Sequence, residues 1–190
     1  MAYYCILRNF RHGRVLEIGS GHSTRVALQA FERNTTGEIV SIEPFPSKTL
    51  EKMPITLHEG FAQDFDADFF NDQLADGDVF FFDSTHTVKA SPDCCHLYLR
   101  ILPQLRRNVI VHVHDIALPK GISVTNAIEK HIFWTEQYLL AALLCDNPKA
   151  EYVLGSVFAN MRAPAKVERI MGAKHGRAGE ASGSVGTDPE

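Results

Sequence analysis

Residues 14–24, RVLEIGSGHST, decide the fold, because a short aliphatic run stops at a pair of glycines and continues into an amphipathic stretch. Gly19 and Gly21 let the backbone bend sharply and approach a ligand closely. The free N–H groups at the start of the following helix would present partial positive charge to that ligand. The sequence therefore predicts a strand, a turn and a helix that together cradle a nucleotide-like molecule.

A second acidic position supports this interpretation. Glu43 ends the strand-like run 39–42 and lies 24 residues after Gly19. In a doubly wound sheet, a carboxylate at this point meets the two ribose hydroxyls of a bound nucleoside. We therefore expect Glu43 to bind a ribose.

The residues after the glycine pair narrow the choice of ligand. A dinucleotide fingerprint has a third Gly or Ala three positions after the second glycine, and this chain has Thr24 there. This disfavours a nicotinamide oxidoreductase. No Gly-Lys-Ser/Thr follows, which argues against a phosphate-binding P-loop. Taken alone, the glycine pair is also compatible with an ordinary tight turn between a strand and a helix.

Strand and helix patterns alternate along most of the chain. Periodicity predicts a strand that begins at Val15 and further strands over 39–42, 55–58, 78–82, 109–113 and 152–154. It predicts helices over 23–33, 48–52 and 64–74, and two more that begin at Ser91-Pro92 and at Thr135. This order predicts an α/β fold, a Rossmann-like, doubly wound and mostly parallel sheet with helices on both faces. We expect one domain over residues 1–163 and a largely disordered tail over 164–190, because residues 172–190 hold five glycines and Val185 is their only sizeable aliphatic side chain.

Composition excludes several classes of protein. The 190 residues are 45% hydrophobic and 22% charged with a net charge of −4, and no basic cluster exceeds Arg106-Arg107, so a nucleic-acid partner is not expected. The four cysteines have no C-x-x-C spacing, which favours a reducing, cytoplasmic location. No apolar run approaches the roughly 18 residues that would span a bilayer, so we expect no membrane partner.

Two more predicted strands end in polar residues that the same edge of the sheet would collect. Asp83 and His86 follow one strand, and the other runs into His112-Val113-His114-Asp115. A histidine can accept a proton at neutral pH, so His86 is a candidate base for a hydroxyl group, with Asp83 beside the reacting atoms or a metal.

The same residues offer a metal-binding interpretation. Asp83, His114 and Asp115 carry ligand atoms suited to Mg²⁺ or Mn²⁺. The alternatives are that Asp83 caps the next helix, that His112 is a hydrogen-bonded core histidine, and that Asp115 satisfies N–H groups of its loop.

The motifs quoted so far resemble a known family. Residues 14–24, 39–46, 80–88 and 102–119, with WTEQYLL at 134–140, resemble the class I S-adenosylmethionine-dependent methyltransferases of the methyltransferase 24 type. VIVHVHDIALP at 109–119 and WTEQYLL are the most specific runs, and the resemblance covers about Tyr3 to Leu154. More distantly, DSTH at 83–86 is similar to metal-dependent sugar O-methyltransferases, in which the Asp and a later acidic pair hold Mg²⁺ and the His is the base. Here His114 replaces the first acid of that pair.

The resemblance implies S-adenosylmethionine as cofactor and roles for particular residues. The positions implied for cofactor binding are Glu17, Gly19, Ser20 and Gly21 at the methionine end, Ser23 in the same turn, Glu43 at the ribose, Phe45 near the adenine, Asp64 accepting from the adenine amino group, and Asp83 near the methyl group.

The implied activity is O-methylation of a small-molecule or saccharide hydroxyl, with a small-molecule acceptor as partner and self-association left open. Relatives usually carry a longer helical segment before the first strand and a strand after the sixth. The alternative is therefore a truncated, catalytically silent S-adenosylmethionine-binding module that serves as a subunit or regulator.

Overall fold

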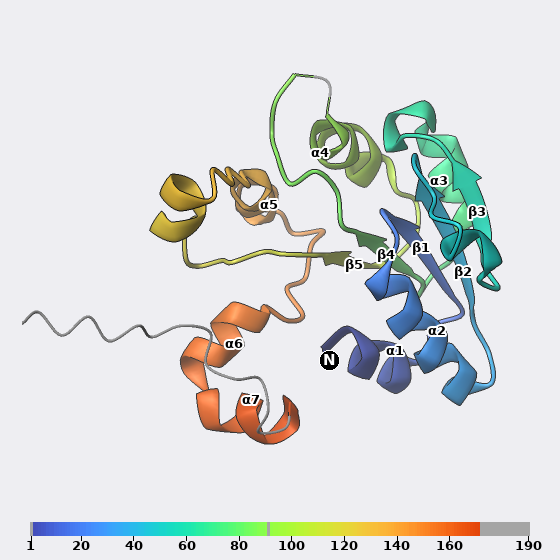
Figure 1. Ribbon diagram of the computed structural model, residues 1–190, viewed down its shortest axis with the longest axis horizontal. Coiled ribbons are helices and arrows are strands. Elements are labelled where there is room, and N and C mark those ends of the chain that lie inside the picture. Colours follow the sequence, from blue (N-terminus) through green and yellow to red (C-terminus); the bar gives the residue numbers. More distant parts are fainter. Residues whose placement is uncertain (1, 91, 172–190) are drawn as a thin grey trace, which may run out of the picture.

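Five parallel strands form one sheet in the order β3-β2-β1-β4-β5, in a computed structural model that describes residues 2–90 and 92–171 (Figure 1). The strands are β1 (Arg14–Ile18), β2 (Glu38–Glu43), β3 (Thr56–Glu59), β4 (Val79–Phe82) and β5 (Ile110–Val113). The order reverses at β1, because β2 lies on one side of it and β4 on the other. This reversal is the point at which ligands bind in doubly wound sheets.

Helices precede, connect and follow the strands. They are α1 (Ala2–Phe10), α2 (His22–Asn34), α3 (Ala67–Gln73), α4 (Asp93–His96), α5 (Glu136–Leu144), α6 (Ser156–Arg162) and α7 (Pro164–Met171). Shorter turns of helix are η1 (Leu50–Lys52), η2 (Ala62–Asp64), η3 (Leu97–Ile101), η4 (Leu102–Gln104) and η5 (Thr125–Glu129). No helix in the described ranges is long and apolar enough to cross a membrane.

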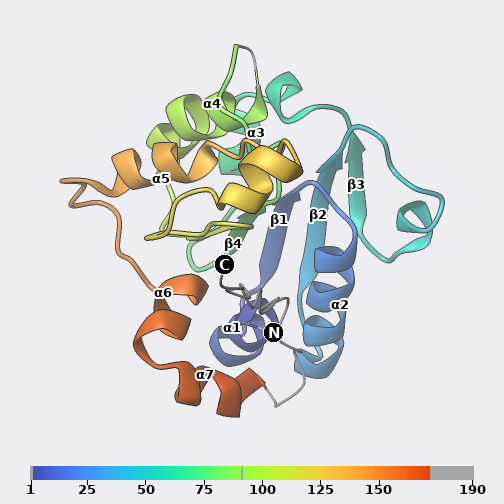
Figure 2. The same cartoon turned by 60° about the vertical axis from the view of Figure 1, so that its left-hand side comes forward.

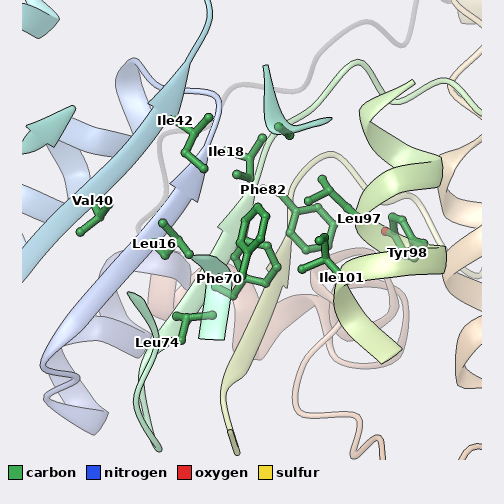
Figure 3. Packing of buried hydrophobic residues seen from close by; sticks show 12 residues of the cluster. Leu16, Ile18, Val40, Ile42, Phe70, Leu74, Phe82, Leu97, Tyr98 and Ile101 are labelled. Atoms are coloured by element: carbon green, nitrogen blue, oxygen red, sulfur yellow. The ribbon is translucent and has the colours of Figure 1, made fainter. Parts of the chain in front are cut away.

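Each face of the sheet carries its own core, because alternate side chains of a strand point to opposite faces. In β4, Phe80 and Phe82 pack with α3 and with the helix that runs through α4 and η3 (Figure 3). Val79 and Phe81 pack against α1 and α2 on the other face. All four side chains are buried, as their continuous apolar run predicts for a central parallel strand.

The predicted fold class is confirmed, with helices on both faces of a parallel sheet. The start of β1, the glycine turn and α2 follow the predicted pattern closely. Thr135 stands at the N-cap of α5 as expected, although its hydroxyl accepts a hydrogen bond from the backbone N–H of Val88 at 2.8 Å rather than from the helix.

Three predictions for the second half of the chain were wrong. Residues 152–154 form no strand, so β5 is the edge of the described sheet, and Val111 is 39% exposed where a strand buried on both faces was expected. Pro92 is the N-cap of α4 rather than its first residue, because its ψ of 162° is extended. Ser91, the predicted cap, lies outside the described residues.

The two ends of the chain also differ from expectation. The pattern analysis gave no helix before β1, yet α1 buries Tyr3 and Leu7 against the sheet. Helix α7 lies at the start of the segment predicted as a disordered tail, and the boundary after residue 163 falls between α6 and α7. The prediction for residues 172–190 lies outside the described residues.

Candidate functional site

Backbone hydrogen bonds bring the carboxyl ends of four strands together around the glycine turn. The N–H of Gly19 donates to Ile42 O at 3.0 Å, and the N–H of Asp83 donates to Ile18 O at 2.9 Å. The N–H of His114 donates to Phe82 O at 3.1 Å. The polar residues that follow β1, β2, β4 and β5 therefore lie along one edge of the sheet, as predicted.

Glu43 holds the turn from the end of β2. Its Oε2 accepts from the backbone N–H of Ser20 at 3.1 Å and from the Ser20 hydroxyl at 3.3 Å. Its Oε1 accepts from the N–H of Phe45 at 3.0 Å. Each carboxylate oxygen can accept two hydrogen bonds, so Oε1 of Glu43 retains capacity to bind a hydroxyl group of a ligand.

Two hollows meet at the glycine turn. Ser20, Gly21 and His22 line both of them. The smaller, of about 210 Å³, is also lined by Glu43 and Phe45. The larger is an open groove of about 2160 Å³ whose wall includes Ser23, Asp83, His114 and Asp115. Eight of the predicted site residues thus line the two hollows around one turn.

The two glycines have different structural roles. Gly19 has a φ of 77°, and a Cβ atom there would lie 2.2 Å from the backbone oxygen of Asp83. The glycine is thus required by the close approach of β1 to the end of β4. Gly21 has a φ of 156°, and a Cβ atom there would meet nothing within 4 Å. Only Gly21 therefore presents open space in which its missing side chain leaves room for a ligand.

Glu17 lies beneath the turn rather than in either hollow. Its side chain is fully buried, and its Oε1 accepts from the Thr24 hydroxyl at 2.7 Å. Burial raises the pKa of Glu17 to about 7, and the negative charges of Glu43 and Asp83 add to this effect, although the hydroxyls of Thr24 and Ser41 oppose it. This position does not fit the implied contact with the methionine end of the cofactor and is that of a structural acid under the turn.

Phe45 and Asp64 are only partly where a role at the adenine requires them. Phe45 is 78% exposed, lines the smaller hollow, and meets Phe61 edge to face at 5.8 Å between ring centroids. Asp64 lines neither hollow. Its Oδ2 accepts from the N–H of Phe61 at 2.8 Å and so shapes the turn after β3.

His86 is held between two carboxylates. Its Nδ1 lies 2.7 Å from Glu136 Oε2 and its Nε2 lies 3.0 Å from Asp83 Oδ1. The ring is nearly buried, packs against Trp134 at 4.7 Å between centroids, and sits on a left-handed backbone with a φ of 57°. The three side chains form an Asp83–His86–Glu136 triad that joins the loop after β4 to the start of α5.

The triad favours a protonated histidine. Burial lowers the pKa of His86, but the hydrogen bonds to Asp83 and Glu136, together with their charges, outweigh burial and raise the pKa to about 9. Hydrogen bonds from His114 and His86 hold the pKa of Asp83 well below its usual range. An imidazolium that donates from both nitrogens cannot accept another proton. The predicted role of His86 as general base therefore does not follow from this geometry.

His114 and Asp115 do not form the predicted metal site with Asp83. Nδ1 of His114 lies 3.5 Å from Asp83 Oδ1 and 3.2 Å from Asp115 Oδ1, so the imidazole occupies the place between the carboxylates. The hydrogen bond that its ring donates to Asp83 is the largest factor that raises the pKa of His114. Within residues 2–90 and 92–171, no group of three or more His, Cys, Asp and Glu side chains is arranged to hold a metal ion.

His112 lies on the face that carries α1. Its ring is 4.7 Å from Phe81 and 4.9 Å from Tyr3 between centroids, and burial lowers its pKa to about 4. It stacks on His114 at 6.4 Å, which confirms that the two histidines share a face. His112 is a neutral, partly buried packing residue.

Glu136 and Trp134 are the site residues that the sequence reasoning did not select. The first turn of α5 clamps the loop after β4, because the N–H of Glu136 donates to His86 O at 3.1 Å while its side chain binds the His86 ring. Both residues stand in the WTEQYLL run. The signal available in the sequence was Glu136 itself, an acid in the first turn of a mostly apolar helix.

Comparison with known proteins agrees with this geometry. A model of the methyltransferase 24 family, described as a methyltransferase domain, matches residues 16–116, which is just over half of the chain and runs from within β1 to beyond β5. No curated protein gives a match. The chain belongs to this methyltransferase domain family, among the class I methyltransferases that use S-adenosylmethionine as methyl donor.

Proposed function

We propose that this protein transfers the methyl group of S-adenosylmethionine to a hydroxyl of a small molecule or saccharide. The observation that carries the proposal is that Ser20, Gly21 and His22 separate two hollows of different character. The smaller contains the Glu43 carboxylate, which suits a ribose. The larger contains Asp83, which suits the acceptor.

The residues around the turn fit the cofactor. Gly21 leaves open space beside the first turn of α2, and Oε1 of Glu43 has accepting capacity left for a ribose hydroxyl. Phe45 offers an exposed ring at the mouth of the smaller hollow. When bound, S-adenosylmethionine supplies a methyl group on a positively charged sulfur, which an oxygen nucleophile can attack.

Asp83 is the group that we assign to the acceptor hydroxyl. Its interactions with His86 and His114 use Oδ1, which leaves Oδ2 able to accept a hydrogen bond from a hydroxyl group. His86 then acts as a positioning residue, since its imidazolium fixes Asp83 and is itself fixed by Glu136. Catalysis would rest mainly on orientation of the acceptor oxygen, which can supply several kcal/mol.

A divalent metal does not enter this proposal. A cation between Asp83 and Asp115 would have to displace His114 and would lie near the protonated His86 ring. If the proposal holds, methyl transfer will be unchanged when the protein is treated with a chelator.

Calorimetry with S-adenosylmethionine tests the cofactor half of the proposal. We expect Glu43→Ala to weaken binding at least tenfold, because hydrogen bonds to a charged group are worth about 1.5–3 kcal/mol. The matched control is Glu59→Ala, because Glu59 is the register partner of Glu43 at the end of β3 but lines neither hollow. Equal affinities of the two variants would refute the assignment of the ribose site.

A screen of metabolite extracts with labelled methyl donor tests the transfer half. We expect label in an acceptor with a hydroxyl group, and a loss on the order of 100-fold with Asp83→Asn at unchanged cofactor affinity. Binding of cofactor without transfer to any extract would instead favour the silent binding module.

A further inference from the structure

The sheet of this protein ends at a strand edge with free hydrogen-bonding groups. The N–H groups of Ile110 and His114 donate toward β4, to Asp78 O and Phe82 O. Because this direction alternates along a parallel strand, the N–H groups of Val111 and Val113 point to the other side. No strand pairs with that side in the part of the chain that the structure describes.

A segment with the character of a strand lies unused near this edge. Tyr152, Val153 and Leu154 are 57%, 60% and 50% exposed, although their sequence predicts a buried strand. They line the same groove of about 2160 Å³ as β5. The described chain therefore contains an apolar strand, β5, whose outer edge pairs with no strand, and an apolar, strand-like segment that belongs to no sheet.

The segment belongs to an arm that is set apart from the rest of the fold. Helices α6 and α7 follow it and pack against each other (Figures 1 and 2). The connection from α5 passes through Asp146, which has a left-handed φ of 51°, and through Pro148, whose ring restricts the backbone. A short restrained hinge of this kind favours exchange of an element between copies over folding back within one chain.

We propose that a second copy of this chain completes the sheet, with residues 152–154 of each copy added as a strand to β5 of the other. The exchange is reciprocal and gives a two-fold symmetric dimer. It satisfies the outward N–H groups of Val111 and Val113, and it removes an apolar sheet edge that would otherwise promote aggregation. This inference does not depend on the proposed methyl transfer.

The exposed apolar surface of the groove is sufficient for a dimer of modest size. The side chains that would be covered are those of Val111, Tyr152, Val153, Leu154 and Met161, all exposed by 39% or more. At on the order of 100 Å² each, they amount to roughly 500 Å² per chain and roughly 1,000 Å² for the pair. This is about the smallest area expected of a specific interface.

Light scattering of the full chain during gel filtration gives the first test. We expect a mass of twice 21.2 kDa at micromolar concentration. Val153→Asp and Val111→Lys, which alter the two sides of the same pairing, should each give a monomer with an unchanged circular dichroism spectrum. The matched control is Val124→Asp, because Val124 is 76% exposed and lies outside the groove. A monomeric wild-type chain, or a dimer that survives both groove variants, would overturn the proposal.

Disulfide trapping separates exchange between copies from closure within one chain. Exposed Cys5 and Cys145 are first replaced by serine. Chains carrying Val111→Cys and chains carrying Val153→Cys are then co-expressed with different tags and oxidised. A covalent dimer that contains both tags is the expected product. If the double variant Val111→Cys/Val153→Cys instead forms a monomer with an internal disulfide, the strand is supplied by the same chain and the exchange is refuted.

Discussion

Replacement of Glu17 by glutamine should make the protein more stable at pH 8 and leave its stability at pH 4 unchanged. Burial raises the pKa of this carboxyl to about 7. Between the ordinary glutamate pKa of 4.5 and about 7, the unfolded chain releases the proton while the folded chain keeps it. The free energy of unfolding therefore falls as the pH rises through this window and levels off above it. Glutamine does not ionise, so the variant lacks this loss.

The size of the effect follows from the same two values. The difference between a pKa of 4.5 and about 7 corresponds to at most about 3 kcal/mol, since each pKa unit is worth about 1.4 kcal/mol. Glutamine keeps the oxygen that accepts from the Thr24 hydroxyl and places an amide donor near Ser41. Urea unfolding of both proteins at pH 4, 5, 6, 7 and 8 gives the difference in free energy at each pH.

Parallel stability curves for wild type and Glu17→Gln across this range would refute the argument. Glu59→Gln, at an exposed strand end, is the control for replacing a glutamate as such. Glu17→Gln also tests the function of Glu17, because we expect a buried acid under the turn to make no contact with the ligand. We expect the affinity of Glu17→Gln for S-adenosylmethionine to stay within about threefold of wild type, less than 1 kcal/mol.

Three further predictions concern the turn, the triad and a helix cap. Gly19→Ala should cost more than about 2 kcal/mol of stability in thermal unfolding, because its Cβ would meet the backbone of Asp83. The control Gly77→Ala, at a glycine with a similar φ of 85° and open space around it, should cost less. Equal losses in the two variants would show that the contact with Asp83 does not matter. In nitrogen NMR spectra, both ring nitrogens of His86 should be protonated at pH 7.5, and the ring should lose one proton near pH 9. A titration midpoint near pH 6.5 would contradict the triad. Asp66→Ala should lower the free energy of unfolding by about 1 kcal/mol, because its side chain caps α3, and an unchanged midpoint in urea would contradict this.

The first half of the fold was predictable because its signals are local and agree with one another. At residues 14–24, the strand pattern, the glycine pair and the helix pattern all favour the same turn. The run VFFF at 79–82 is apolar at every position, which only a strand covered on both faces tolerates. The parallel sheet with helices on both faces then followed from the alternation of strands and helices.

Prediction was weaker where burial depends on partners far away in the chain. Residues 152–154 have a strand pattern, but a strand forms only where a sheet edge pairs with it, and periodicity does not report that edge. Helix α1 was missed because its nine residues carry three aromatic side chains and a cysteine without capping signals. Its stability comes from Tyr3 packing on Phe81.

In the candidate site too, locally determined features were predictable and features that depend on distant residues were not. Glycine turns and strand ends are fixed by the backbone, so Glu43 could be assigned to the edge of the sheet from its place in the sequence alone. Whether a side chain can accept a proton in catalysis depends on its neighbours. For His86 these neighbours include Glu136, which is 50 residues away in the sequence. Sequence spacing identifies an imidazole near the edge, but its pKa is raised by the hydrogen bonds to Asp83 and to the buried Glu136 together. Asp83 can therefore be expected to remain ionised throughout the neutral range, with one oxygen bound to His86 and the other free to orient an acceptor.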